Sequence, residues 1–513
     1  MRYTFTFIAI ILVFYIPLSL LDYDQFPFSD GAEHGAAVRE LANHPIHPQD
    51  PMLANHSGNS PRFVPSIFLI ALFMRLLQLD VLTILKIFLI VYFFLFLVSA
   101  ALFSSEYFND KGQGLWSLAS LLFLWGRGWD GANAYMFSTI LYTAYFPSVV
   151  SFSLSLLGLY FQLLFFKRNN KWYFVIEAIL GALVFVNHPL TGLFFFICSG
   201  ILYIEKRIPL RKMIFCYVLS VIVALTLIGV WPYYAFLPNL LKVASGEMIQ
   251  TLDYQLTRDY LYSMPLLRSG PALAGIPLLI LFLLRKRYLL LVGGFATFSL
   301  IYLTGYFFRI SLAERFIFFI IFLLQMTVSR ILREWFSFPL PWLKRDFKKI
   351  TTWFLILLLT LGIIIQMAFL CRNFILPAFE YRHDLHFPHY VSPNKMQLEL
   401  KKYLREGDVV LSDIYSSWSI PVYTGARIIA LFHTPPHVND NLERVKAVET
   451  FYDGSTTSEE RNKIVKKYGV THILLNFYIA GKGLESVLEE MGFSVITRGT
   501  SFCLYSVPAP MLR

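Results

Sequence analysis

Three ionisable residues lie within about one helical turn of each other in a polar segment near the N-terminus. This segment, residues 22 to 62, separates the first two apolar stretches and holds six of the 33 acidic residues and four of the 11 histidines. Asp30, Glu33 and His34 belong to its Ser-Asp-Gly-Ala-Glu-His sequence, and such side chains act as general bases or metal ligands. The pattern after Asp30 predicts a helix through Leu41. Asp30 is therefore either a catalytic group or the cap of this helix, accepting its free backbone N–H groups.

A later loop contains a second candidate pair. Arg127 and Asp130 lie in the sequence Trp-Gly-Arg-Gly-Trp-Asp-Gly, residues 125 to 131. Tryptophans in such a loop are typical anchors at a membrane surface. An acid and an arginine in this loop can also complete a site that Asp30 begins.

Two more candidates lie at the ends of apolar stretches. His188, within Asn-His-Pro-Leu-Thr-Gly, separates two short stretches. It is either a functional group or a histidine bonded to a backbone carbonyl. Arg315 follows Glu314 at the start of another stretch. Its planar guanidinium suits the oxygens of a lipid phosphate, and the alternative is an internal ion pair with Glu314.

The composition identifies the class of protein that contains these residues. The mean hydropathy is +0.57, aromatic residues make up 17% of the chain and charged residues only 15%, which indicates a polytopic membrane protein. Of the net charge of +11, +10 belongs to the apolar part of the chain, up to residue 370. Basic residues beside membrane spans explain this excess, so a nucleic-acid partner is not expected.

About eleven apolar segments are candidate spans. Placing the N-terminus in the cytoplasm puts the main basic clusters, at 167–171, 206–212, 285–287 and 330–349, on the cytoplasmic side, as the positive-inside rule requires. The predicted spans are residues 3–21, 81–104, 115–129, 147–166, 172–188, 190–204, 213–231, 271–284, 289–305, 312–328 and 350–370.

One apolar stretch, residues 63 to 79, fits this topology only if it does not cross. It is long enough to span a membrane, but Pro65 and Arg75 interrupt it, and counting it as a span would put the basic clusters outside. We therefore predict an interfacial or re-entrant helix at 63–79. Residues 1–370 then form a transmembrane domain whose first outer loop is 22–62.

Residues 371–513 are predicted to form an extracytoplasmic α/β domain, because short β-rich runs alternate there with helical patterns. Thr457 and Glu460 predict a capping box, and Gly469 predicts the end of that helix. His433, His437 and Asp440 are close enough in sequence to bind a metal, although a polar loop also explains them. The predicted strands are 409–412, 427–431, 470–476, 493–497 and 502–507, and the predicted helices are 394–405, 440–452, 458–468 and 482–491.

The layout of the chain resembles the class C (GT-C fold) membrane glycosyltransferases. The likeness consists of a first span with a cytoplasmic N-terminus, an acidic outer loop, a helix that does not cross, many further spans and an outer α/β domain. At the residue level Asp30 matches the catalytic aspartate of the family's first outer loop. Asp130 matches a second-loop acid, and Arg315 stands where such enzymes often keep a basic residue. The chain departs from the family's commonest pattern by having Asp-Gly in place of two adjacent acids.

This resemblance implies a fold of about eleven spans with a C-terminal α/β domain, in the plasma or inner membrane. It also implies transfer of a sugar from a polyprenyl-phosphate-linked donor to a glycan, lipid or protein acceptor outside the cytoplasm. Asp30 and Asp130 are candidates to hold Mg²⁺ or Mn²⁺, and no other cofactor is expected. The catalytic candidates are Asp30, Glu33, His34 and Asp130, and the substrate-binding candidates are His188, Arg315 and Arg127.

Two alternatives stay open. A transporter or lipid flippase would need a polar path across the membrane, and Glu177 is one of the few ionisable residues inside the predicted spans. A non-catalytic GT-C-like scaffold would use its outer domain to recruit partners.

Overall fold

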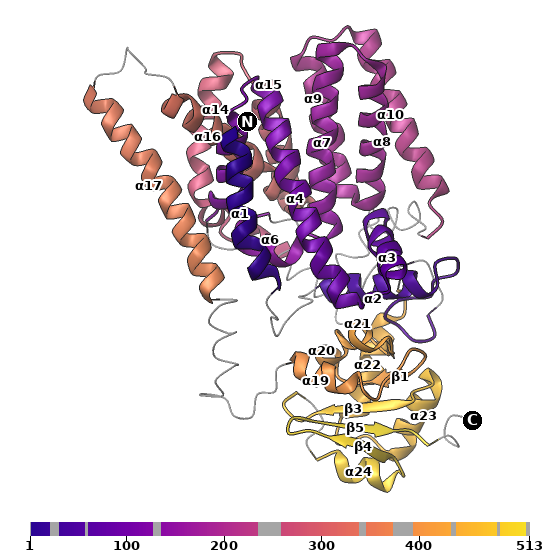
Figure 1. Ribbon diagram of the computed structural model, residues 1–513. Coiled ribbons are helices and arrows are strands. Elements are labelled where there is room, and N and C mark those ends of the chain that lie inside the picture. Colours follow the sequence, from indigo (N-terminus) through magenta and orange to yellow (C-terminus); the bar gives the residue numbers. More distant parts are fainter. Residues whose placement is uncertain are drawn as a thin grey trace. The chain divides into compact units, whose positions relative to one another are not determined.

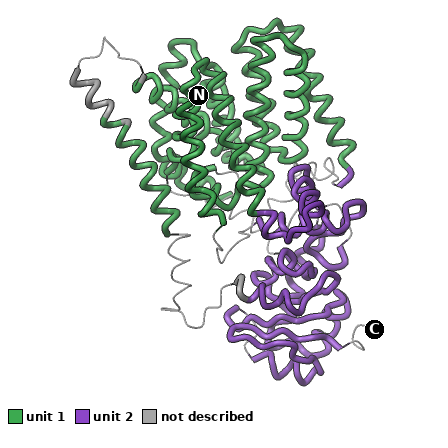
Figure 2. The backbone as a smooth tube through the Cα atoms, viewed as in Figure 1, with its two compact units in different colours: residues 1–21, 86–231, 254–375 green, residues 22–85, 232–253, 376–513 purple. Residues whose placement is uncertain are grey.

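A computed structural model describes most of the chain. The described residues are 2–20, 30–56, 60–126, 135–233, 258–337, 345–372, 393–431, 438–479 and 483–508. They belong to two compact units (Figure 2). Unit 1 consists of Met1–Leu21, Lys86–Trp231 and Tyr254–Ile375, and unit 2 consists of Asp22–Leu85, Pro232–Asp253 and Leu376–Arg513. The first loop therefore shares a unit with the tail.

Unit 1 is a bundle of helices (Figure 1). Every one of the eleven predicted spans coincides with helix over most of its length. Among the described residues, seven helices or helical runs are long and apolar enough to cross a membrane: Arg2–Leu20, Val81–Tyr107, Pro147–Arg168, Leu210–Val230, Pro265–Leu284, Leu289–Phe308 and Ala313–Phe336. The helices are α1 (Arg2–Leu20), α4 (Val81–Tyr107, which begins in unit 2), α5 (Gln113–Phe123), α6 (Phe137–Thr143), α7 (Pro147–Arg168), α8 (Lys171–Asn187), α9 (Pro189–Glu205), α10 (Leu210–Val230), α13 (Pro265–Ser269), η2 (Gly270–Ala274), α14 (Gly275–Leu284), α15 (Leu289–Phe308), η3 (Ala313–Phe316), α16 (Ile317–Ser337) and α17 (Arg345–Leu370).

Aromatic side chains fill the centre of unit 1. The ring of Phe194 in α9 lies 4.6 Å from that of Phe319 in α16 and 5.7 Å from that of Phe298 in α15, measured between centroids. Phe152 in α7 meets Phe322 in α16 edge to face at 5.1 Å. These contacts pack α7, α9, α15 and α16 around a common core.

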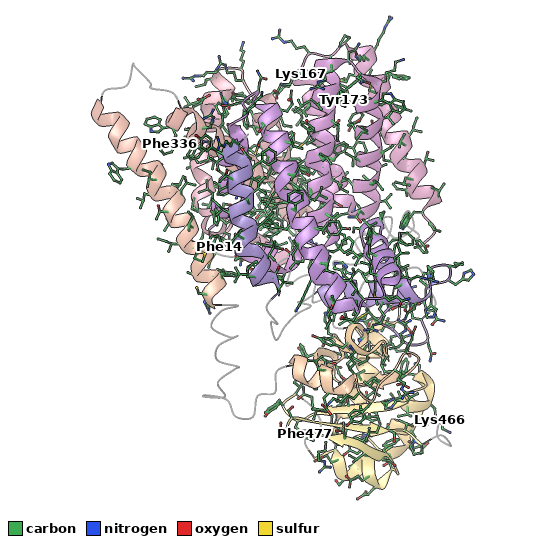
Figure 3. All side chains as sticks on the ribbon, in the orientation of Figure 1. Phe14, Lys167, Tyr173, Phe336, Lys466 and Phe477 are labelled. Atoms are coloured by element: carbon green, nitrogen blue, oxygen red, sulfur yellow. The ribbon has the colours of Figure 1, made fainter. Side chains whose placement is uncertain are left out.

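The basic clusters of unit 1 gather at one end of the bundle, as predicted. Lys167 at the end of α7 pairs with Glu106 of α4 at 2.8 Å, and Glu205 at the end of α9 accepts hydrogen bonds from Tyr107 and from the Leu290 backbone N–H of α15. Figure 3 shows Lys167 at the upper end of this unit. The cytoplasmic location of this end stays a prediction.

Helix α5 is shorter than the predicted span 115–129, because it ends at Phe123. The chain then turns to bring Gly126 against the α13 segment, where the Gly126 N–H donates to the Arg268 carbonyl at 2.9 Å. A Cβ on Gly126 would lie 2.0 Å from the Leu267 carbonyl oxygen. This backbone approach requires glycine and cannot continue a helix.

The stretch predicted at 63–79 forms α3 (Pro65–Leu77), a helix of 13 residues in unit 2. Its length of about 20 Å is less than the roughly 30 Å of a bilayer core, so it cannot cross as a straight helix. One face packs on α2 (Gly31–Asn43), and the other face exposes apolar side chains. An interfacial location, which stays a prediction, would cover the exposed residues Leu69, Leu72, Phe73, Leu76 and Leu77.

The tail in unit 2 contains a five-stranded mixed sheet with strand order β2-β1-β3-β5-β4. The first three strands are parallel and the last three are antiparallel, with β3 in both sets. All five predicted strands and all four predicted helices are present, whereas α20 and α21 were not predicted. The elements are β1 (Val409–Leu411), β2 (Arg427–Ile428), β3 (His472–Asn476), β4 (Ser494–Arg498), β5 (Phe502–Ser506), α19 (Pro393–Leu400), α20 (Ile414–Ser417), α21 (Ile420–Thr424), α22 (Asn441–Tyr452), α23 (Ser458–Tyr468) and α24 (Glu485–Glu490).

Local sequence signals account for the start and end of α23. The Thr457 side chain accepts from the Glu460 N–H, and the Glu460 carboxylate accepts from the Thr457 N–H, which confirms the predicted capping box. Gly469 ends the helix at a φ of +65°, a left-handed conformation that favours glycine.

Candidate functional site

Asp30 and Glu33 lie together at the start of α2, and Arg62 joins them. The Arg62 Nη2 is 2.5 Å from the Glu33 Oε2 and 3.7 Å from the Asp30 Oδ2. The Glu33 side chain is only 5% exposed, whereas that of Asp30 is 34% exposed. The arginine therefore balances a buried carboxylate and leaves the neighbouring carboxylate accessible to solvent.

Asp30 does not cap α2, so that interpretation was wrong. The residue occupies the N-cap position, but its backbone is helical, with φ −52° and ψ −15°, and its side chain makes no capping hydrogen bond. A capping residue normally has an extended backbone that turns its side chain towards the free N–H groups. Here the Asp30 carboxylate lies towards Arg62 instead.

His34 is on the same helix but is buried. Its side chain is 3% exposed, and its backbone N–H donates to the Asp30 carbonyl at 3.0 Å. Asp30, at the N-cap, and Glu33 and His34, in the first turn of α2, thus lie at the start of the same helix. Their catalytic roles stay predictions.

His188 links α8 to α9 by a local hydrogen-bond network. It is the residue between the two helices, and its Nδ1 accepts from the Thr191 N–H at 3.3 Å and lies 2.7 Å from the Thr191 hydroxyl oxygen. His188 thus caps α9 in the way that asparagine or serine often does.

Glu314 and Arg315 lie in η3, between α15 and α16. The Glu314 side chain is fully buried, and its Oε1 lies 4.0 Å from the Arg315 Nε. A separation of 4.0 Å is too long for a hydrogen bond. The internal pair is therefore loose, and the Arg315 side chain is 29% exposed.

Arg268 was not singled out from the sequence. It is 8% exposed, its guanidinium lies 3.6 Å from the centroid of the Tyr260 ring, and it donates to the Ser263 hydroxyl at 3.2 Å. The Arg268 carbonyl also accepts the hydrogen bond from the Gly126 N–H. Gly126 is the last described residue before the segment that contains Arg127 and Asp130. The only signal in the sequence was a basic residue within a largely apolar stretch, before Ser-Gly-Pro.

His188 and Arg315 lie at the same end of unit 1. Helices α8 and α15 both begin at the basic end, and each crosses the bundle before it reaches His188 or η3. The neighbouring core residues Phe194 and Phe319 are in contact. Both candidates are therefore at the end opposite the basic clusters, as the predicted topology requires.

Several predicted site residues are not brought together by the described structure. Arg127 and Asp130 lie outside the described residues, as do His433 and His437 of the predicted loop in the tail. Asp30, Glu33 and His34 belong to unit 2, whereas His188 and Arg315 belong to unit 1. Their convergence on one site stays a prediction.

The described residues contain one group with the right spacing for a metal ion, and it is not the predicted one. Oxygen and nitrogen atoms of Glu40, His44 and Glu406 lie within 4.8 Å of one another. However, Glu40 is already paired with Arg427 and accepts from the Gln49 N–H at 2.7 Å. At Asp30, the positive charge of Arg62 repels a metal ion that would bind the same carboxylate. Asp130, the other predicted ligand, lies outside the described residues, so a metal ion held by Asp30 and Asp130 stays a prediction.

Comparison with known proteins gives the fold. No family model and no curated protein match the chain. The structure of ArnT from Cupriavidus metallidurans in the apo state shares 12% identity and a TM-score of 0.59, over 100% of this chain and 99% of ArnT. The structure of the same protein bound to undecaprenyl phosphate shares 11% identity and a TM-score of 0.56, over the same shares of both chains.

The oligosaccharyltransferase from Archaeoglobus fulgidus, tethered with an acceptor peptide, shares 11% identity over 93% of this chain and 69% of that protein, with a TM-score of 0.49.

The ArnT similarity extends over the helical bundle, the first loop and the tail, which are the parts that define the predicted architecture. The chain is thus a polytopic helical protein with a C-terminal α/β part, and it has the GT-C fold.

Proposed function

We propose that the chain is a membrane glycosyltransferase that moves a sugar from a polyprenyl-phosphate-linked donor to an acceptor outside the cytoplasm. The observation that carries this proposal is the accessible Asp30 carboxylate at the start of α2, beside a Glu33 that is neutralised by Arg62. The GT-C fold supports it, as does the binding of undecaprenyl phosphate by the ArnT neighbour.

The chemistry assigns one task to each candidate. The acceptor hydroxyl oxygen attacks the anomeric carbon of the donor, the bond from that carbon to the phosphate oxygen breaks, and Asp30 takes the hydroxyl proton. Attack opposite the leaving group inverts the anomeric configuration. Glu33 and His34 support Asp30 from the same turn of α2, and Asp130 is a further catalytic candidate.

The negative charge that develops on the departing phosphate needs a positive partner. Arg315 fits this task because its side chain is partly exposed and only loosely paired with Glu314. His188 and Arg127 are the other candidates to bind the donor. His188 would use Nε2 for this, since its Nδ1 is engaged with Thr191.

The transporter alternative has one structural feature to consider. Glu177 of α8 is buried, and the Ser220 hydroxyl of α10 donates to it at 3.2 Å. Polar pairs of this kind commonly join helices within a membrane. Glu177 is thus accounted for by helix packing and does not favour transport.

The test is the Asp30→Asn substitution in the full-length protein. Purified wild type is first supplied with a panel of polyprenyl-phosphate hexoses and pentoses to find a donor that it uses. Asp30→Asn is expected to lower the transfer rate by roughly 10²- to 10⁴-fold, the usual contribution of a general base, with unchanged abundance and thermal stability. Asp453→Asn, in an exposed part of the tail, is the matched control and is expected to retain full activity. Full activity of Asp30→Asn would refute the proposal for this residue.

A further inference from the structure

The first-loop helix α2 depends on contacts with other elements. It is 13 residues long and includes Gly31 and Gly35, and each glycine weakens an isolated helix by about 1 kcal/mol relative to alanine. Nevertheless 11 of its 13 residues are buried. Packing rather than helix propensity must therefore stabilise α2. Its packing partners include α3 and, in the tail, α21 (Figure 1).

Gly35, directly after His34, lies directly against α21. A Cβ on Gly35 would lie 2.4 Å from the Val422 Cγ2 and 3.1 Å from the Leu85 Cδ1. Val422 is fully buried in α21. Its methyl group therefore occupies the space that the missing side chain of Gly35 leaves, one turn from Asp30.

Arg39, one turn further along α2, holds the end of α21. Its Nη2 donates to the Val422 carbonyl at 2.8 Å and to the Tyr423 carbonyl at 3.3 Å. Carbonyls in the last turn of a helix lack partners within the helix and carry partial negative charge, so they suit a guanidinium. Burial lowers the pKa of Arg39, although the charges of Glu406 and Asp80 oppose that shift.

The same interface continues to the end of α2. Glu40, which is buried, pairs with Arg427 of β2, and the Asn43 amide donates to the Glu406 carboxylate at 2.8 Å. Residues 35 to 43 thus make a row of contacts with residues 406 to 427 of the tail. A helix held along this much of its length has little freedom to rotate or slide.

We propose that the tail positions the catalytic turn of α2 through Val422 and the carbonyl groups of Val422 and Tyr423, with Gly35 and Arg39 as positioning residues. This proposal rests on the proposed role of Asp30. It assigns the α/β tail a part in the reaction that is separate from any binding of acceptor. A small shift of α2 would move the Asp30 carboxylate away from the acceptor hydroxyl.

The experiment introduces a clash at this contact and then relieves it. Gly35→Ala places a methyl group against Val422, and Gly35→Ala/Val422→Ala removes the opposing methyl groups. We expect Gly35→Ala to lower kcat by about 100-fold, the effect of a displacement of about 1 Å, with little change in the KM for the donor. The double variant is expected to recover most of the loss. Hydrogen exchange of the peptide covering residues 30 to 43 should increase in the single variant and return in the double variant.

A substitution that only destabilises the tail distinguishes a loss of kcat through misplacement of α2 from a loss caused by lower stability. Thr457→Ala removes the cap of α23, which makes no part of the α2 interface, and it should lower the melting temperature without changing kcat. Rates are measured well below all melting temperatures. The inference is overturned if Gly35→Ala keeps the wild-type kcat and exchange, if Val422→Ala gives no rescue, or if Thr457→Ala lowers kcat equally. A loss of transfer in Asp30→Asn with no effect of Gly35→Ala would refute the positioning role alone, whereas activity in Asp30→Asn would refute the proposed function.

Discussion

Leu53 of the first loop pairs in parallel with Ile428 of β2. The Ala54 N–H donates to the Ile428 carbonyl at 2.9 Å, and the Ile428 N–H donates to the Met52 carbonyl at 2.8 Å. Strand β2 is the last strand on its side of the sheet, and an uncovered edge exposes unpaired backbone groups. The first loop covers that edge and is therefore a structural part of the tail.

Arg444→Met tests how strongly the loop and the tail support each other. The Arg444 side chain is buried, and its Nη1 donates to the Ala54 carbonyl at 2.9 Å and to the Ile429 carbonyl at 3.2 Å. Its loss leaves these buried acceptors without that donor, at about 1–3 kcal/mol for each group left unsatisfied. We expect a clear drop in melting temperature and faster proteolysis within residues 44 to 56.

Lys467→Met is the control for this substitution. Lys467 forms an ion pair with Glu443 in which both side chains are more than half exposed, and such surface pairs contribute about 0–1 kcal/mol. Equal melting temperatures for the two variants would show that Arg444 does not fasten the loop.

The elements of the tail were predictable, but the attachment of the loop to them was not. Strands such as 472–476 are apolar runs bounded by turn residues, and the signals that begin and end α23 lie within its own sequence. Leu53 and Ile428, by contrast, are far apart in the chain and carry no matching local pattern. Helices α20 and α21 are too short to show an apolar repeat.

The site shows the same division between local and distant information. The helix after Asp30 follows from residues next to it, so it was predicted. Arg62 was not recognised as part of the site, because its partner Glu33 is 29 residues earlier and an arginine beside a predicted interfacial helix has many explanations. The structure shows that the Asp30 carboxylate lies near Arg62 and makes no capping hydrogen bond, whereas its catalytic role stays a prediction.

Glu33 and Arg62 are expected to stabilise the folded protein only when both are present. Arg62→Met removes the positive charge next to a carboxylate that is 5% exposed, and breaking a buried ion pair in this way typically costs about 3–5 kcal/mol. We expect a large loss of thermal stability in Arg62→Met. The double variant Arg62→Met/Glu33→Gln should recover part of it, because no charge is then left buried.

A double-mutant cycle of melting temperatures measures this coupling. If the two single substitutions simply add in the double variant, Glu33 and Arg62 do not interact in the folded protein. Measuring all variants in detergent at one ionic strength keeps salt screening of the pair the same throughout the cycle.

His56 predicts a pH dependence of the unit that contains the loop and the tail. A hydrogen bond with the buried Asp50 raises the pKa of His56 above 6.5, while burial opposes the shift. Protonated His56 therefore stabilises the folded state. This contribution is fully present below pH 6.5, and it is lost as the pH rises through the higher pKa of the folded protein. His56→Gln should cost more stability at about pH 6 than at about pH 9.

His472 provides the opposite case in the same unit. Burial lowers the pKa of His472, and Asp408 only partly opposes this shift. Protonation then disfavours the folded state, so wild type loses stability from this group as the pH falls below 6.5, and His472→Gln removes that loss. Melting curves of both variants across this range check the two signs. Parallel pH profiles of the two variants and wild type would contradict both.

Arg315→Gln tests the predicted contact with the donor phosphate. A hydrogen bond to a charged group contributes about 1.5–3 kcal/mol, so its loss should lower kcat/KM for the polyprenyl-phosphate donor by about 10- to 100-fold. Arg315→Lys keeps the charge but not the planar fork and should fall between wild type and Arg315→Gln. Arg309→Gln, an exposed arginine at the end of α15, is the matched control for general loss of positive charge. An equal effect of Arg309→Gln would attribute the change to the charge of the surface and not to Arg315. Unchanged kinetics of Arg315→Gln, in a protein that transfers sugar, would remove Arg315 from the donor site.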